Sequence, residues 1–143
     1  MMKRREFITL LGGAATAWPL AARAQQPERM RRIGALTTLA ADDPFGQAEV
    51  AAFQRALQQS GWNDGRNVRI DIRRHESDAD RARRYAQELV ALAPDILLAD
   101  ATVSVTALLH VTRTLPIVFA GVADPVGAGF VDSLSRPGGN ITG

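Results

Sequence analysis

The sequence predicts an α/β fold: a parallel-sheet αβα sandwich in which strands and helices alternate along the chain. Short apolar segments, at residues 31–40, 68–74, 95–100 and 115–121, are separated by segments whose apolar residues recur every three or four positions. This alternation is typical of parallel strands joined by right-handed crossovers, with helices on both faces of the sheet. A chain of 143 residues, 46% of them hydrophobic, is long and apolar enough for one such domain.

The first strand and helix are predicted within residues 31–60. The segment "RRIGALTTLA" is apolar after two arginines and continues into two threonines. Asp43 is the expected N-cap of the helix, with Pro44 at the first position, where its missing N–H costs nothing. Gly61 provides the left-handed residue that ends the helix. One face of this helix is apolar and carries Val50, Phe53 and Leu57.

The second strand and helix follow directly. "VRIDIRR" at 68–74 alternates apolar and charged residues, which predicts a strand near a sheet edge with one solvated face. Ser77 and Asp80 form a capping box at the start of the helix, and Pro94 closes it. Its buried stripe is predicted to consist of Tyr85, Leu89 and Val90.

The third and fourth strands, "DILLAD" and "LPIVFAG", are apolar without alternation, as expected of central parallel strands covered on both faces. A third helix is predicted between them, roughly from Ser104 to Thr112. After the fourth strand, Asp124 is expected to cap a short helix that has Pro125 at its first position. The following "RPGGN" is predicted to be a turn.

Residues 1–24 have the organisation of a bacterial export signal. A basic start at Arg4 and Arg5 is followed by an apolar run from Phe7 and by small residues that end at Ala24, the expected cleavage point. The arginine pair resembles the twin-arginine motif, although its flanking residues leave the general secretion route open. The apolar run is too short and too interrupted to span a bilayer. We therefore expect a soluble periplasmic protein that starts near residue 25.

The charge and cysteine content argue against several classes of partner and chemistry. Of 17 basic and 15 acidic residues, four and one lie within residues 1–24, which leaves 13 against 14. No aromatic residues alternate with the arginines of 69–84, so we read these as a solvated face and expect no nucleic-acid partner. The absence of cysteine excludes disulfides, thiol catalysis and cysteine-ligated zinc.

Motifs for phosphate or nucleotide chemistry are incomplete. The glycines at 127 and 129 lack the third glycine of a dinucleotide fingerprint and do not follow the first strand, so no cofactor is expected. The carboxylates of Asp42, Asp43 and Asp100 resemble the acidic pocket of a phosphoacceptor domain. That chemistry also needs a lysine, and residues 25–143 contain none.

Catalytic and metal-binding constellations are not found in the sequence. His75 and His110 are isolated from each other and from other ligand types, so they suggest neither a metal pair nor a catalytic triad. No serine occurs in a G-x-S-x-G elbow. We therefore expect no enzyme activity, no catalytic residue and no metal.

The candidate ligand site lies where the predicted strands end. In open parallel sheets, ligands bind beyond the carboxyl ends of the strands. These ends are small or hydroxylated in this chain, which leaves room for a ligand. They comprise Thr37 and Thr38, then Asp100, Ala101 and Thr102, and finally the segment from Gly121 to Asp124.

Four segments together resemble the extracytoplasmic substrate-binding proteins of ABC transporters, in the group related to tryptophan and tyrosine uptake. They are "RRIGALTT", "SGWNDGRNVRIDIR", "AQELVALAPDILLADAT" and "TLPIVFAGVADPVGAGFVDSLSRPGGNITG". The resemblance covers nearly all of residues 25–143 and is most specific in the last segment. It implies a type I periplasmic-binding fold with two αβα lobes, of which residues 25–143 would be the N-terminal lobe, the second lobe being absent.

The resemblance also implies which residues face the ligand. The wall after the first strand corresponds to Thr37 and Thr38, and the usual Gly-Thr after the third strand reads Ala101-Thr102, which adds a methyl group. The last cleft-facing segment corresponds to Val122, Ala123 and Asp124. Hydroxyl and backbone N–H groups at such positions can hold an amino-acid carboxylate. Ordinary helix capping by Thr102, Ser104 or Asp124 is the alternative interpretation.

The implied function is capture of a small molecule, with amino acids among the candidates, and its delivery to ABC permease subunits. Membrane contact would then occur only through export and permease docking. An extracytoplasmic sensor domain of a signalling system is the alternative from another class, and the genes of its partners would distinguish it. An enzyme of the same layered fold is disfavoured because the sequence supplies no nucleophile, base or metal cluster.

Overall fold

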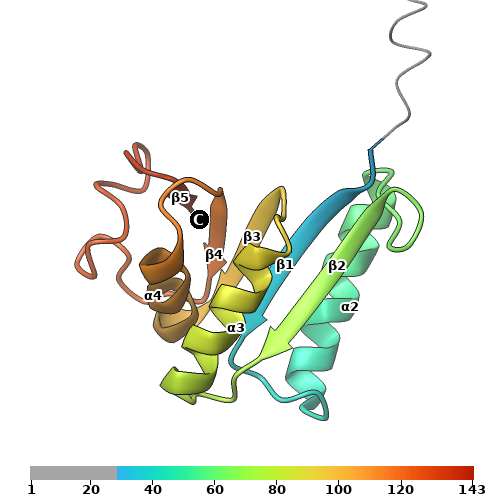
Figure 1. The fold of residues 1–143 in the computed structure, drawn as a ribbon, viewed down its shortest axis with the longest axis horizontal. Coiled ribbons are helices and arrows are strands. Elements are labelled where there is room, and N and C mark those ends of the chain that lie inside the picture. The colour runs from blue at the N-terminus through green and yellow to red at the C-terminus, as the bar shows by residue number, and fades with distance from the viewer. Residues whose placement is uncertain (1–28) are drawn as a thin grey trace, which may run out of the picture.

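The computed structural model describes residues 29–143 and shows a five-stranded parallel sheet (Figure 1). The predicted signal residues Arg4, Arg5, Phe7 and Ala24 lie outside the described residues. The strands run in the order β2-β1-β3-β4-β5, so β2 is an edge strand, as its alternation predicted. The elements in chain order are β1 Arg31–Thr37, α2 Pro44–Gln59, β2 Val68–Arg74, α3 Ala79–Ala91, β3 Ile96–Asp100, α4 Ala101–Val111, β4 Ile117–Ala120 and β5 Ile141–Thr142. The predicted α/β class is confirmed.

The ends of α2 follow the predicted chemistry. The carboxylate of Asp43 accepts a hydrogen bond from the N–H of Gly46 at 3.0 Å, and Pro44 is the first residue of the helix. Gly61 has φ +87°, the left-handed conformation that glycine adopts without steric cost. Both predicted ends of this helix are therefore confirmed.

Two helix starts differ from prediction. The N-cap of α3 is Asp78, whose carboxylate accepts from the N–H of Arg81 at 2.8 Å. Ser77 was the predicted cap, but its φ of +64° takes it out of the extended conformation that an N-cap needs. Helix α4 begins at Ala101, before the predicted start at Ser104, because the backbone turns into the helix directly from the end of β3.

The segment after β4 also differs from prediction. Asp124 acts as a cap, since its carboxylate accepts from the N–H of Gly127 at 2.8 Å, but it caps a turn, and the predicted short helix is not formed. Gly129, at φ +76°, turns the chain away from a helical path. The strand β5 was not predicted, because two residues after a glycine-rich turn show no periodicity.

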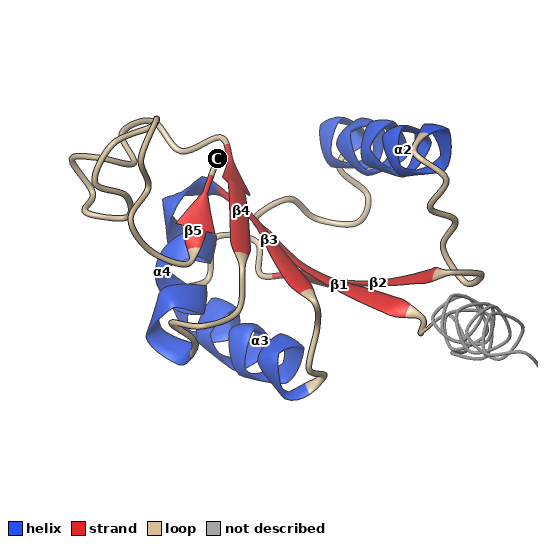
Figure 2. Cartoon of the chain, turned by 90° about the horizontal axis from the view of Figure 1, so that it is seen from above, coloured by secondary structure: helices blue, strands red, loops and turns tan. Residues whose placement is uncertain are grey.

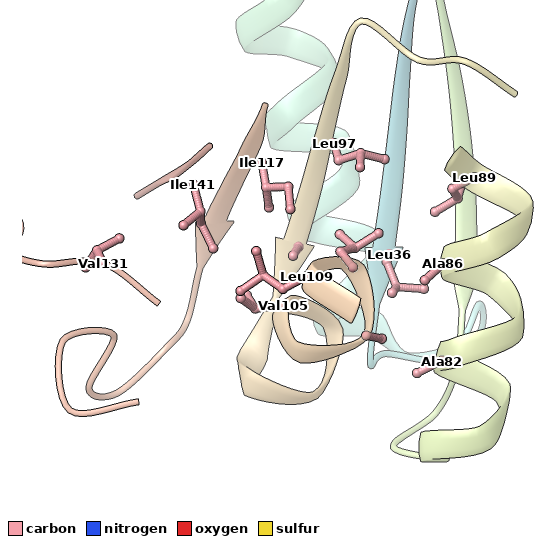
Figure 3. Packing of buried hydrophobic residues seen from close by; sticks show 13 residues of the cluster. Leu36, Ala82, Ala86, Leu89, Leu97, Val105, Leu109, Ile117, Val131 and Ile141 are labelled. Carbon is pink, nitrogen blue, oxygen red and sulfur yellow. The ribbon is translucent and has the colours of Figure 1, made fainter. Parts of the chain in front are cut away.

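The hydrophobic core lies between the sheet and the helices α3 and α4, which cover one of its faces (Figures 2 and 3). Leu89 on α3, Leu97 on β3, Leu108 on α4 and Ile117 on β4 are fully buried. Gly34 on β1 makes this close packing possible, because a Cβ there would lie 2.9 Å from the Leu97 side chain and 3.3 Å from that of Leu89.

Helix α2 lies on the other face of the sheet and stands away from it (Figure 2). A cavity of about 500 Å³ separates the helix from the strands and is lined by Val50 and Phe53 of α2 and by Ile72 and Val118 of the sheet. The apolar face predicted for this helix is therefore only half buried. Helices cover both faces of the sheet, as predicted, but those on the α3 side pack much more closely.

Candidate functional site

The carboxyl ends of β1, β3 and β4 lie side by side and form one edge of the sheet, here called the carboxyl edge. In the parallel register, Leu36 is paired with Ala99, and Asp100 is paired with Ala120. The residues that follow these strands are therefore neighbours in space although they are distant in sequence. The three segments predicted as ligand walls all start from this edge.

Asp100 connects the first two of these walls. Its carboxylate accepts hydrogen bonds from the hydroxyl of Thr37, from the N–H of Thr38 at 2.8 Å and from the hydroxyl of Thr38 at 3.2 Å. A fourth hydrogen bond comes from the hydroxyl of Ser104, at 3.1 Å. The loop after β1 is thus tied to the end of β3 by one half-buried side chain.

Behind Asp100, a buried histidine completes a chain of hydrogen bonds. His75 is fully buried, and its Nε2 lies 2.8 Å from Oγ of Ser104. Because Ser104 gives its one hydroxyl proton to Asp100, Nε2 of His75 must carry a proton and donate it to Ser104. The Nδ1 atom of His75 is buried and has no hydrogen-bond partner among residues 29–143. The serine lies between the histidine and the aspartate, so this is not the order of a nucleophilic triad, in which histidine is central.

Burial lowers the pKa of His75 below its usual value of 6.5, because the charged imidazolium is poorly solvated inside the protein. The negative charges of Asp100 and Asp78 oppose this shift, while Arg81 adds to it. The side chain is therefore neutral in the folded protein at neutral pH. This agrees with an imidazole that donates from Nε2 and has no proton on Nδ1.

We expect folding stability to fall when the pH drops below about 6.5, the value at which the unfolded histidine takes up a proton. The unfolded state binds this proton more readily, so the contribution of His75 is complete above pH 6.5 and is lost toward the lower folded-state pKa. Because a single proton is involved, the free energy of unfolding can change by at most about 1.4 kcal/mol per pH unit. Urea denaturation at several pH values between 5 and 7.5 measures this pH dependence. His75→Gln should flatten this part of the profile, whereas His110→Gln, at an exposed position, should not.

Ala101 and Thr102 form the first turn of α4 at the carboxyl edge. Ala101 has φ +56°, a left-handed conformation that costs a non-glycine residue about 1–2 kcal/mol. This geometry explains why glycine is the better residue at the position. Thr102 is exposed, and the carboxylate of Asp100, the N-cap residue of α4, makes no cap hydrogen bond.

Replacing Ala101 with glycine should raise the free energy of unfolding by about 1 kcal/mol, because glycine adopts positive φ without strain. The urea midpoint measures this change. In contrast, Ala56→Gly on the exposed face of α2 should lower stability by about 0.5–1 kcal/mol. Equal effects of the two substitutions would show that the conformation at Ala101 is not strained.

The third predicted segment follows β4. A Cβ on Gly121 would lie 3.9 Å from the backbone nitrogen of Ala101, so the start of this segment is close to the start of α4. The side chain of Val122 packs against the core, whereas Ala123 and Asp124 are exposed. Within residues 29–143, no hydrogen bond joins Asp124 to Thr37, Thr38 or Asp100, because its carboxylate bonds to Gly127.

The sequence predicted Thr37 and Thr38, together called the threonine wall below, as ligand-facing residues, but it gave no indication of the contacts behind them. Asp100 was counted among the strand ends and considered for phosphoacceptor chemistry, but its hydrogen bonds to the two threonines and the connection between His75 and Ser104 were not foreseen. A charged residue at the end of the apolar strand "DILLAD" is the one signal that could have indicated Asp100. The partnership of His75 with Ser104 spans 29 positions and depends on the sheet order.

Two further findings concern residues 29–143. No three histidine, aspartate or glutamate side chains in this range come close enough together to hold a metal ion. Nor does the range contain a helix whose length and apolarity would allow it to cross a membrane.

The described residues thus form a parallel αβα lobe with a polar carboxyl edge. Residues 39–143, most of the chain, match the family described as ABC transporter substrate binding protein. The chain belongs to this family, as the resemblance indicated.

Similar proteins include one that is named for a ligand and one that was solved with a ligand. A tyrosine-binding protein of Clostridioides difficile (strain R20291) is 37% identical over 91 residues, which are 64% of this chain and 26% of that protein. An ABC domain from Streptococcus pneumonia, solved in complex with L-Trp, has a TM-score of 0.72 and 32% identity over 79% of this chain and 37% of its own. A conserved domain protein from Vibrio cholerae O1 biovar El Tor has a TM-score of 0.73 and 31% identity, over 80% of this chain and 38% of its own. The chain thus spans between a quarter and two fifths of these proteins.

Proposed function

We propose that this protein is the solute-capturing component of an ABC uptake system and that its ligand is an amino acid, with L-tyrosine and L-tryptophan as the first candidates. Family membership and two relatives, one named for tyrosine and one bound to L-Trp, support this choice. The observation that carries it is the carboxyl edge, where Asp100 holds Thr37 and Thr38 beside the start of α4.

In this proposal the described lobe supplies one wall of the cleft. Thr37, Thr38, Ala101 and Thr102 line it, together with the segment Val122, Ala123 and Asp124. A second lobe would supply the other wall, and the ligand would favour the closed state by contacting both. Binding proceeds without covalent change, and the closed protein docks on permease subunits. Residues 1–24 would direct export to the periplasm.

Isothermal titration calorimetry of the full-length protein with each of the 20 amino acids tests this function. We expect saturable binding of L-tyrosine or L-tryptophan, with glycine as a control that lacks the side chain. Absence of heat from every amino acid would contradict the proposed ligand class.

The transport partnership needs a separate test in the cell. We expect the gene to lie beside genes for a permease and an ATPase, and its deletion to reduce uptake of the bound amino acid. A neighbouring kinase or cyclase gene together with unchanged uptake would instead indicate a sensor.

A further inference from the structure

The hydroxyl protons of the threonine wall are already used inside the protein. A threonine hydroxyl has one proton to donate. Thr37 gives its proton to Asp100 and accepts the N–H of Leu39 at 3.2 Å. Thr38 gives both its hydroxyl proton and its backbone N–H to Asp100. The lone pairs that remain on these oxygens can still accept a hydrogen bond, but the groups have no donor left to offer a ligand.

The negative charge behind this wall has no ionic partner within residues 29–143. Each oxygen of Asp100 accepts two hydrogen bonds, from neutral hydroxyl or amide groups, which fills the roughly four acceptor positions of a carboxylate. No arginine or histidine of the described range lies within ion-pair distance of it. Arg74, at the end of β2, donates to the carbonyl of Leu39 at 3.3 Å instead. The wall thus combines half-buried acceptors with an uncompensated charge.

We propose that the hydroxyl oxygen of Thr38, supported by the charge of Asp100, is an acceptor-only subsite for a cationic N–H donor, namely the ammonium group of the ligand. A hydroxyl that donates to a carboxylate becomes a stronger acceptor, because hydrogen bonds in a chain polarise one another. A ligand carboxylate would meet lone pairs and like charge at the same place. This assigns to Thr37 and Thr38 the opposite polarity from the carboxylate-binding role that the sequence suggested. The inference rests on the proposed amino-acid function and specifies which end of the ligand meets this wall.

Asp100→Asn is the variant that tests this polarity. The asparagine keeps the shape of the side chain, and its carbonyl oxygen can still accept from Thr38 N–H and Ser104. Its NH₂ group must donate to the hydroxyl oxygens of Thr37 and Thr38, so their protons turn outward. One substitution therefore removes the charge and converts the wall from acceptor to donor.

The probes are amino acids and analogues that differ only in the ammonium group. Calorimetry on the full-length protein compares L-tryptophan with indole-3-propionate, and L-tyrosine with 3-(4-hydroxyphenyl)propionate. We expect the wild-type protein to prefer the amino acid, and Asp100→Asn to reduce the affinity for it by about ten-fold or more, since a hydrogen bond to a charged group is lost. For the analogues without ammonium, the affinity of Asp100→Asn should be close to that of the wild-type protein or higher.

Asp95→Asn is the matched control, because it makes the same chemical change before the amino end of β3, where the carboxylate accepts the N–H of Arg32 at 2.8 Å. It should leave the preference for the amino acid unchanged. Thr38→Val serves as an independent variant if Asp100→Asn does not fold. Valine has a similar shape but no acceptor, and the same loss of preference is expected.

The outcomes separate this inference from the proposed function. If both members of each pair bind equally to the wild-type protein, or if Asp100→Asn and Thr38→Val keep the wild-type preference, the ammonium subsite is overturned while amino-acid binding stands. If none of the four probes binds to the wild-type protein, and the other amino acids of the 20-member calorimetric screen give no heat either, the proposed amino-acid function is overturned and the subsite with it.

Discussion

Replacing Leu97 with alanine should lower the free energy of unfolding by about 3 kcal/mol. Leu97 is fully buried on β3, the central strand of the sheet, between β1 and β4, and its side chain lies close to Gly34 of β1. Truncation removes buried apolar contacts and leaves a cavity that a closely packed sheet and helix cannot fill by moving together. The urea midpoint at constant slope measures the loss.

Leu134→Ala is the control for this prediction. Leu134 is 70% exposed in the loop after β4, and its truncation should change stability by no more than about 0.5 kcal/mol. A similar loss for Leu97 and Leu134 would contradict the position of the core between the sheet and the pair α3 and α4.

Ser104→Ala should lower the free energy of unfolding by about 2 kcal/mol although it removes a single oxygen atom. The substitution leaves the buried Nε2–H of His75 without an acceptor and removes one of the four donors to Asp100. An unsatisfied buried polar group costs more than the hydrogen bond itself contributes, because the group has also lost its water. Chemical denaturation at pH 7.5, where His75 is neutral, isolates this effect.

Two comparisons make the Ser104 prediction specific. Ser60→Ala, at an exposed position after α2, should change stability by less than about 0.5 kcal/mol. The double variant Ser104→Ala with His75→Phe should cost less than the sum of the single variants, because phenylalanine has no buried donor to satisfy. Strict additivity would show that His75 and Ser104 do not form the described hydrogen bond.

Elements with local signals were predictable from the sequence. The cap at Asp43, the end of α2 at Gly61 and the edge position of β2 all depend on neighbouring residues, and all were confirmed. The errors also have local causes. The cap of α3 is Asp78, since the chain takes positive φ at Ser77, and Gly129, also at positive φ, turns the chain away from a helix after Asp124.

The candidate site was predictable only in part. Parallel topology places the ends of β1, β3 and β4 at one edge, so the position of Thr37, Thr38 and Ala101 followed from the strand pattern. The role of Asp100 depends on a register that pairs residues more than 60 positions apart. No periodicity or motif indicates such a contact. The acceptor character of Thr37 and Thr38 can therefore be inferred only from the structure.

The central claim, that the carboxyl edge binds an amino acid, is tested most directly by NMR titration of labelled full-length protein with L-tryptophan and L-tyrosine. The proposed site predicts saturable amide shifts that begin at Thr38, Ala101 and Thr102. Shifts confined to the opposite edge, around Trp62 and Ile96, or no shifts with either amino acid, would contradict it.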